Sequence, residues 1–244
     1  MDAPLELLFA VAADIEGAAL RARLDAEPGR TGVDLATLGV GDESTDRLRA
    51  MLRERQPRAM ISPGLAGALD PALQAGDVVL VRAWVDPEPP HARCASASPR
   101  LLERTRAALN AVGIASRTAD AVTVDAPLHD SERRQALHRD AGASVVEMEG
   151  SRWAKRAAAA GTEFVSVRVI SDDAATPLPR PRHLLLERSG RIRWNRWLRA
   201  LAQDGRSPQA EEELRRLFRA RREWLAAMHA LDAVGSALLG DLDI

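Results

Sequence analysis

The stretch from Val145 to Asp173 constrains the fold of this 244-residue chain more than any other. It reads VVEMEGSRWAKRAAAAGTEFVSVRVISDD, in which two short apolar runs flank an alanine-rich segment of helical length. Such runs predict buried strands, and the segment between them predicts a connecting helix. Each run ends in carboxylates, so this strand–helix–strand unit is expected to place acidic side chains at one edge of a sheet.

The same alternation continues upstream. Further strands are predicted at Glu6–Ala13, Val33–Gly41, Arg58–Ser62, Asp77–Val85 and Arg117–Val124. Helices are predicted from Asp14 onward and at Glu43–Arg55, Arg100–Val112 and Ser131–Ala141. Pro63–Gly67 and Asp86–Pro99 contain the glycines and prolines typical of loops. The pattern predicts an α/β fold, a three-layer α/β/α sandwich around a mixed, largely parallel sheet.

The sequence changes character after Asp173. Prolines in Ala174–His183 exclude a helix there, whereas Arg191–Leu201 and Glu211–Leu239 have apolar residues at helical spacing. We therefore predict an α/β domain over residues 1–176. Residues 177–244 are predicted to form a C-terminal helical extension that packs on it.

Composition excludes several classes of function. A formal net charge of −1 gives no general attraction to nucleic acid. One cysteine, Cys94, and five scattered histidines indicate neither a disulfide framework nor a metal site, and we expect no cofactor. No apolar run reaches membrane-spanning length and the N-terminal residues lack a leader pattern, so we expect a cytoplasmic protein.

Four motifs carry a family resemblance: AADIEG from Ala12, SPGLAGALDPALQAGDVVLV from Ser62, VVEMEG from Val145 and VRVISD from Val167. From about Leu7 to Asp173 the chain resembles the superfamily of purine nucleoside phosphorylases and methylthioadenosine/S-adenosylhomocysteine nucleosidases. Its GLAGALDP form and its arginine-rich, tryptophan-bearing tail are most similar to the hopanoid-associated phosphorylase branch, which is linked to removal of adenine from adenosylhopane. The resemblance implies cleavage of the N-glycosidic bond of an adenosine-type nucleoside.

The resemblance implies that Asp172, in the pair Ser171–Asp172, is the general acid. A purine is a poor anionic leaving group unless it is protonated, and a carboxylic acid near the ring nitrogen N7 supplies that proton. Taken by itself, Asp172 is better interpreted as a strand-terminal residue that caps a turn. The EMEG motif at this separation favours catalysis.

The EMEG motif is expected to hold the ribose. The resemblance implies that Glu149 accepts hydrogen bonds from the 2′ and 3′ hydroxyls and that Met148 packs against the sugar. Arg168 lies four residues before Asp172, on the same face of the strand. We expect an ion pair between Arg168 and Glu149 that keeps Glu149 ionised. Glu147 is expected to be an exposed carboxylate at a helix start.

Glu16 and the glycine loop bear on the reaction type. The resemblance implies that Glu16 positions an attacking water as general base, whereas a carboxylate there would repel phosphate. The alternative is an ordinary glutamate in the first turn of a helix. Gly64, Leu65 and Ala66 are expected to bring backbone N–H groups to the ligand. Leu65 replaces the family's usual serine, so hydrolysis is slightly favoured and phosphorolysis stays open.

Two departures from the family keep a second hypothesis open, a catalytically inactive nucleoside-binding protein. Leu65 lacks the usual hydroxyl, and Val122–Leu128 contains no aromatic residue to stack on adenine. The expected ligands are a nucleoside with water or phosphate, and the resemblance implies a homo-oligomer, commonly a dimer or a hexamer. Arg191–Arg199, with two tryptophans, is typical of a helix at a membrane surface, here the inner membrane. A core-packed helix with a solvated arginine face is the favoured interpretation.

Overall fold

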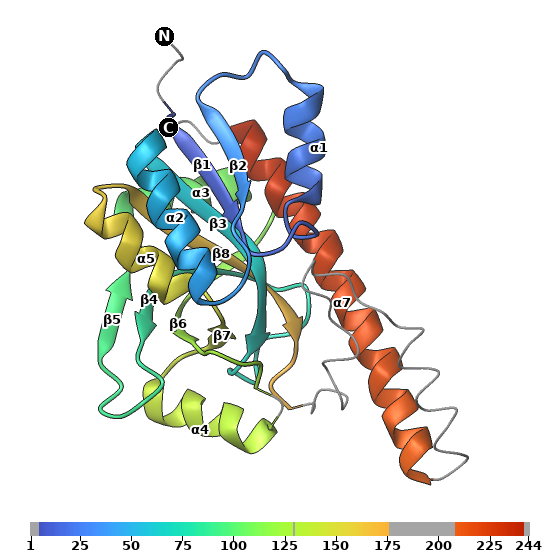
Figure 1. Cartoon of the computed structure of the whole chain (residues 1–244). Coiled ribbons are helices and arrows are strands. Elements are labelled where there is room, and N and C mark those ends of the chain that lie inside the picture. The colour runs from blue at the N-terminus through green and yellow to red at the C-terminus, as the bar shows by residue number, and fades with distance from the viewer. Residues whose placement is uncertain (1–4, 129, 176–207, 242–244) are drawn as a thin grey trace.

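The computed structural model describes residues 5–128, 130–175 and 208–241, in which eight strands form one mixed sheet (Figure 1). The strands are β1 (Leu7–Val11), β2 (Val33–Thr37), β3 (Ala59–Ala68), β4 (Val78–Val85), β5 (Arg93–Ser96), β6 (Ser116–Thr123), β7 (Val145–Glu147) and β8 (Glu163–Asp172). Their order is β2-β1-β3-β7-β6-β4-β5, and β8 pairs with both β3 and β4. Parallel pairings outnumber antiparallel ones, so the predicted fold class is confirmed.

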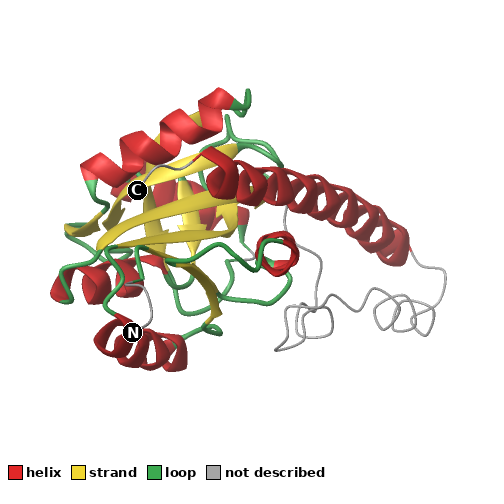
Figure 2. Ribbon diagram, turned by 90° about the horizontal axis from the view of Figure 1, so that it is seen from above, coloured by secondary structure: helices red, strands yellow, loops and turns green. Residues whose placement is uncertain are grey.

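Helices lie on both faces of this sheet (Figure 2). They are α1 (Ala18–Ala26), α2 (Asp42–Arg55), α3 (Pro99–Ala111), α4 (Ser131–Ala141), α5 (Gly150–Ala159) and α7 (Pro208–Asp241). On one face α2 packs against α5, and on the opposite face α3 packs against α7, which also contacts α1. Helix α4 lies at the end of the sheet where β7 and the loop after β6 are found (Figure 1).

Local sequence explains where α3 and α4 begin. Ser98 accepts a hydrogen bond from the Leu101 N–H and is followed by Pro99, whose missing N–H is harmless in a first turn. Asp130 caps α4 by accepting from the Glu132 N–H. Gly142 ends α4 at φ 65°, a left-handed conformation that favours glycine. The Asp130 cap therefore fixes the start of α4 directly after the loop that precedes it.

The core explains why the strands of this chain are apolar throughout. All five residues of β1 are buried, and β8 is buried from Phe164 to Ile170 because layers cover both faces. The second half of α7 joins the same core through Ala227, Leu231 and Leu238. Its first half extends past the body of the sheet (Figure 1). The division at residue 176 stays a prediction.

Three predicted boundaries were wrong. The expected loop Pro63–Gly67 is part of β3, because β8 pairs with it through this segment and satisfies its backbone groups. The expected loop Asp86–Pro99 contains β5, an edge strand that pairs with β4. Helix α1 begins at Ala18 rather than Asp14. The helix predicted at Arg191–Leu201 lies outside the described residues.

Within the described ranges, no helix has both the length and the apolar character needed to cross a membrane.

Candidate active site

Gly64 marks the point where three of the predicted site residues converge. It pairs with Arg168 across β3 and β8. A Cβ atom built on Gly64 would lie 2.7 Å from Arg168 Nη1 and 3.0 Å from Glu16 Oε1. Glu149 is also close, since its pKa responds to the charges of Glu16 and Arg168. A side chain at position 64 would therefore press on both charged groups and shift them from these positions.

Glu16 is held by the backbone of two separate segments. Its Oε2 accepts from the N–H groups of Ala12 and Ala13, both at 3.1 Å, and its Oε1 accepts from the Leu65 N–H at 2.9 Å. We call these three donors the N–H cradle. Glu16 lies in the turn before α1, so the alternative of a first-turn helical glutamate was wrong. A carboxylate has about four acceptor positions, so one on Oε1 remains for a ligand.

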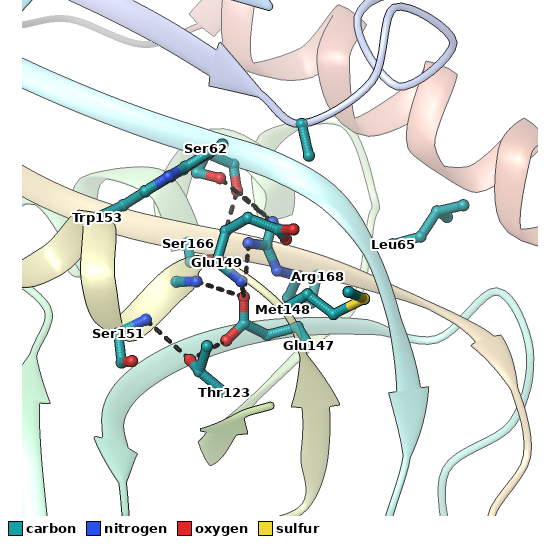
Figure 3. Close-up of polar contacts among 12 residues, drawn as sticks. Ser62, Leu65, Thr123, Glu147, Met148, Glu149, Ser151, Trp153, Ser166 and Arg168 are labelled. Carbon is teal, nitrogen blue, oxygen red and sulfur yellow. Dashed lines mark hydrogen bonds and ion pairs between the residues drawn. The ribbon is translucent and has the colours of Figure 1, made fainter. Parts of the chain in front are cut away.

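Arg168 pairs with Glu147, and the expected ion pair with Glu149 was wrong (Figure 3). Arg168 Nη2 lies 3.2 Å from Glu147 Oε2, and both side chains are buried. The same oxygen accepts from the backbone N–H groups of Glu149 at 3.0 Å and Gly150 at 2.5 Å, and Oε1 accepts from the Thr123 hydroxyl. Glu147 is thus a fully bonded internal anion, not the exposed helix-start carboxylate that we expected.

The chain turns at this point, which explains why Glu147 rather than Glu149 receives the guanidinium. Strand β7 ends at Glu147 and α5 begins at Gly150, so the first N–H groups of the helix point back at the Glu147 carboxylate. Arg168 is fixed further by donating to the Ser62 carbonyl at 3.1 Å and to the Ser62 hydroxyl at 3.3 Å. Its charge is consequently matched by Glu147.

Glu149 lies beside this pair with an unusual protonation preference. Burial raises the pKa of Glu149 from 4.5 to about 8, the Glu147 charge contributes to the rise, Arg168 opposes it, and Glu16 adds to it. The side chain is 6% exposed, and its Oε1 has no hydrogen-bond partner among the described residues. Glu149 is accordingly protonated at neutral pH, and Oε1 is available to a ligand hydroxyl.

The apolar members of the site are close to these charges. Met148 and Leu65 are both partly buried, and Figure 3 draws them on the same side of the Arg168 guanidinium. Leu65 packs against the main core, while Ala66 is buried and offers its carbonyl to the Ser171 hydroxyl at 3.2 Å. The site therefore has an apolar side next to its charged one.

Asp172 lies farther along β8, about 13 Å from Arg168 at the rise of an extended strand. Its Oδ1 accepts from the Ser171 hydroxyl at 2.6 Å, and its Oδ2 lies 2.5 Å from Arg134 Nη2. A Cβ on Gly67 would come within 3.1 Å of Oδ2, so this glycine also gives a carboxylate the room it needs. Both oxygens of the predicted acid are thus engaged.

Sequence analysis missed Thr123, Ser62, Arg134 and Glu223. Burial raises the pKa of Glu223 on α7 to about 7, the Asp173 charge adds to this, Arg219 opposes it, and Asp172 also raises it. For Arg134 a signal existed, because it lies one turn before Leu137 on the face of α4 that is buried. For Glu223 no signal existed, because only the tertiary fold brings α7 to β8. The described residues contain no group of three acidic, histidine or cysteine side chains that could hold a metal.

Residues 24–192 match the family model described as the phosphorylase superfamily, which is more than half of the chain. The chain belongs to the phosphorylase superfamily. The superfamily resemblance of the motifs is confirmed, and the hopanoid-associated branch is left as a proposal. No curated protein sequence matches the chain.

Solved structures support the same fold. A methylthioadenosine/S-adenosylhomocysteine nucleosidase of Campylobacter jejuni has a TM-score of 0.66 at 15% identity, covering 96% of this chain and 98% of that one. The futalosine hydrolase of Helicobacter pylori strain 26695 has a TM-score of 0.62 at 20% identity, covering 70% and 88%. A putative methylthioadenosine/S-adenosylhomocysteine nucleosidase of Francisella philomiragia has a TM-score of 0.63 at 18% identity, covering 93% and 99%. At these identities the likeness concerns the fold.

Two of the site residues of this phosphorylase-superfamily chain lie outside the matched segment. Glu16 precedes residue 24, and Glu223 follows residue 192. The roles of Glu16 and of helix α7 must therefore be argued from this chain's own geometry.

Proposed function

We propose that this chain hydrolyses the N-glycosidic bond of an adenosine-type nucleoside and releases adenine. The observation that carries the proposal is Glu16, whose carboxylate is held by the N–H cradle next to Arg168 and Glu149. Membership of the phosphorylase superfamily supports chemistry on a nucleoside-like substrate.

The occupied cradle favours water over phosphate as the nucleophile. Converging backbone N–H groups bind anions, and here all three donate to the protein's own carboxylate. An incoming phosphate would find these donors used and would meet a like charge. Leu65 also offers no hydroxyl to it. Glu16 Oε1 retains an acceptor position, which suits a general base that removes a proton from the attacking water.

Glu149 is the proposed ribose ligand, with Met148 packing on the sugar. Because the pKa of Glu149 is about 8, its carboxyl group enters the reaction neutral and both donates and accepts hydrogen bonds. Ribose hydroxyls that donate to its unpartnered Oε1 become stronger donors as positive charge builds on the sugar in the transition state. Arg168 acts by fixing Glu147, whose carboxylate receives the N–H of Glu149.

Asp172 is the proposed general acid. In the proposed hydrolysis, the oxygen of the attacking water bonds to C1′ of the ribose while Glu16 takes a proton from that water. The electron pair of the broken C–N bond goes to the purine. Asp172 gives a proton to N7 of that purine, with Ser171 orienting the carboxyl group.

The 5′ end of the substrate is proposed to be apolar. Leu65 stands where a serine is usual, and Met148 lies on the same side of Arg168 (Figure 3). The motif resemblance to the hopanoid-associated branch favours adenosylhopane among such nucleosides. A homo-oligomer and contact of Arg191–Arg199 with the inner membrane remain proposals of the same resemblance, and that segment lies outside the described residues.

A nucleoside-binding protein without turnover is the second candidate. It is favoured by Asp172, both of whose oxygens already have partners, and by the absence of an aromatic residue in Val122–Leu128. A protein of this kind would bind adenine or a nucleoside tightly and leave the glycosidic bond intact.

Adenine release from purified full-length protein tests these proposals. The substrates are adenosine, methylthioadenosine and adenosines with long apolar 5′ groups, each with and without phosphate. We expect release that is independent of phosphate and abolished in D172N. Strict phosphate dependence with ribose 1-phosphate as product would overturn hydrolysis, and binding without release across the panel would favour the second candidate.

A further inference from the structure

Arg134 is a buried cation in a helix whose sequence is mostly polar. It lies on α4, its side chain is 3% exposed, and its ion-pair partner Asp172 is 8% exposed. A guanidinium at such a depth is costly unless its N–H groups are bonded and its charge is matched. The contacts of Arg134 meet both conditions, and they lie at the proposed purine end of the site.

The guanidinium joins two separate segments. Toward the loop before α4, Nε and Nη2 donate to the Leu128 carbonyl at 3.1 and 2.8 Å. Toward the end of β8, Nη1 donates to the Asp173 carbonyl at 2.9 Å and Nη2 to Asp172 Oδ2 at 2.5 Å. Because a guanidinium is planar and rigid, these four bonds fix the loop and the strand end relative to each other.

We propose that Arg134 is a positioning residue of the active site, which sets both the general acid Asp172 and the segment Val122–Leu128 against the purine. The inference rests on the proposed function, since it assigns these two elements to the base. The inference goes beyond the proposed function because it names Arg134 as the group that fixes the position of Asp172 relative to Val122–Leu128.

The charge of Arg134 also acts on the proton transfer. As the proposed acid, Asp172 first takes up a proton; when it gives that proton to the base it becomes a carboxylate again, and the adjacent guanidinium stabilises this charged product. After the step, Glu16 releases to the solvent the proton it took from water, and Asp172 takes up a proton from the solvent. Glu223 on α7 interacts with the Asp172 charge, and Asp173, Arg219 and Arg222 also act on Glu223. Arg134 is a cation in direct contact with Asp172, and its charge offsets the negative groups among these.

A Lys and a Met variant at this position separate the two contributions. R134K retains a cation beside Asp172, but the lysine ammonium lacks the planar fork with which the guanidinium donates to both the Leu128 and the Asp173 carbonyl. We expect a KM raised about tenfold with kcat within about threefold of wild type. R134M loses the charge as well, and its kcat/KM is expected to fall about 100-fold through kcat and KM together. R82M, which removes an exposed arginine from the Arg82–Asp120 pair, is the matched control and should change neither constant.

Kinetic constants are measured per folded molecule, with the folded fraction determined by circular dichroism. Wild-type KM and kcat in both Arg134 variants, with only a lower melting temperature, would show a purely structural role and overturn the inference. R134K keeps the test decisive if R134M does not fold.

Hydrogen–deuterium exchange gives a readout that needs no turnover. If wild-type protein releases no base, the proposed hydrolysis fails, whereas the joining of the two segments by Arg134 is still tested. R134K is expected to exchange at least about tenfold faster than R82M in residues 122–128 and 171–175, and to bind adenine more weakly. Unchanged exchange and unchanged adenine affinity would overturn the inference by themselves.

Discussion

Arg168 forms its ion pair with Glu147, and the neighbouring Glu149 has no such partner among the described residues. The first carboxylate is saturated by a guanidinium, two backbone N–H groups and the Thr123 hydroxyl. The second is equally buried but keeps an unpartnered oxygen and a raised pKa of about 8. Glu147 and Glu149, which are separated by one residue, thus have different roles. Glu147 is a structural anion, and Glu149 is available to a ligand.

The pKa of Glu149 predicts a specific pH dependence of stability. Between about pH 4.5 and pH 8 the folded protein holds a proton that the unfolded chain has released, so the free energy of unfolding falls as pH rises through this window. The total loss is on the order of 5 kcal/mol. In E149Q this contribution is absent. Urea denaturation at several pH values should therefore give a shallower slope for E149Q, and equal slopes for both proteins would contradict the prediction.

Breaking the Glu147–Arg168 pair is expected to be severe. E147Q leaves the buried Arg168 charge uncompensated, which costs about 3–5 kcal/mol of unfolding free energy. The double variant E147Q/R168M removes both charges and should recover part of that loss, a coupling that denaturation of wild type, both single variants and the double variant measures. R82M, which removes an exposed arginine, should lose no more than about 1 kcal/mol. Additive losses without recovery would mean that the pair is not coupled.

The variant Gly64→Ala tests whether the positions of Arg168 and Glu16 depend on the absence of a side chain at residue 64. Its methyl group would lie 2.7 Å from Arg168 Nη1 and 3.0 Å from Glu16 Oε1, so both must move. We expect a stability loss of about 1–3 kcal/mol and a decrease in adenine release of at least about 100-fold. Gly29→Ala, where no atom lies within 4 Å of the added Cβ, is the control. Comparable activity of the two variants would show that Glu16 and Arg168 need no fixed geometry.

Removing Glu16 should empty the N–H cradle without removing it. E16A is expected to lower hydrolysis by about 10²–10⁴-fold, because the general base is lost while the Ala12, Ala13 and Leu65 donors remain. Added formate should restore part of the rate by occupying the same donors. Adenine release is followed at increasing formate concentration. A variant as active as wild type without formate would refute the assignment of Glu16.

Much of the architecture could be predicted because it depends on local pattern. The apolar runs and helical segments predicted most elements within a few residues, since burial between two layers requires continuous apolar strands. The segment Pro63–Gly67 could not be predicted as a strand. Its proline and glycines are poor strand formers, and only pairing with β8 compensates for them.

The candidate site was predictable in its members but not in its pairings. Sequence motifs named Glu16, Glu149, Arg168 and Asp172, and the fold brings the first three together beside Gly64. The choice of Glu147 as the partner of Arg168 depends on where β7 ends and α5 begins. Arg134 and Glu223 approach Asp172 from α4 and α7, elements that no motif linked to it.

The sequence by itself therefore determined the α/β fold, the superfamily and the residue types of the site, because strand periodicity and short motifs are local properties of the chain. Tertiary structure alone decided which carboxylate is saturated, which is protonated and which cation holds the proposed acid. The physical reason is that burial and charge pairing depend on distances between atoms from β3, β7, β8, α4 and α7, and those distances exist only once the sheet has formed.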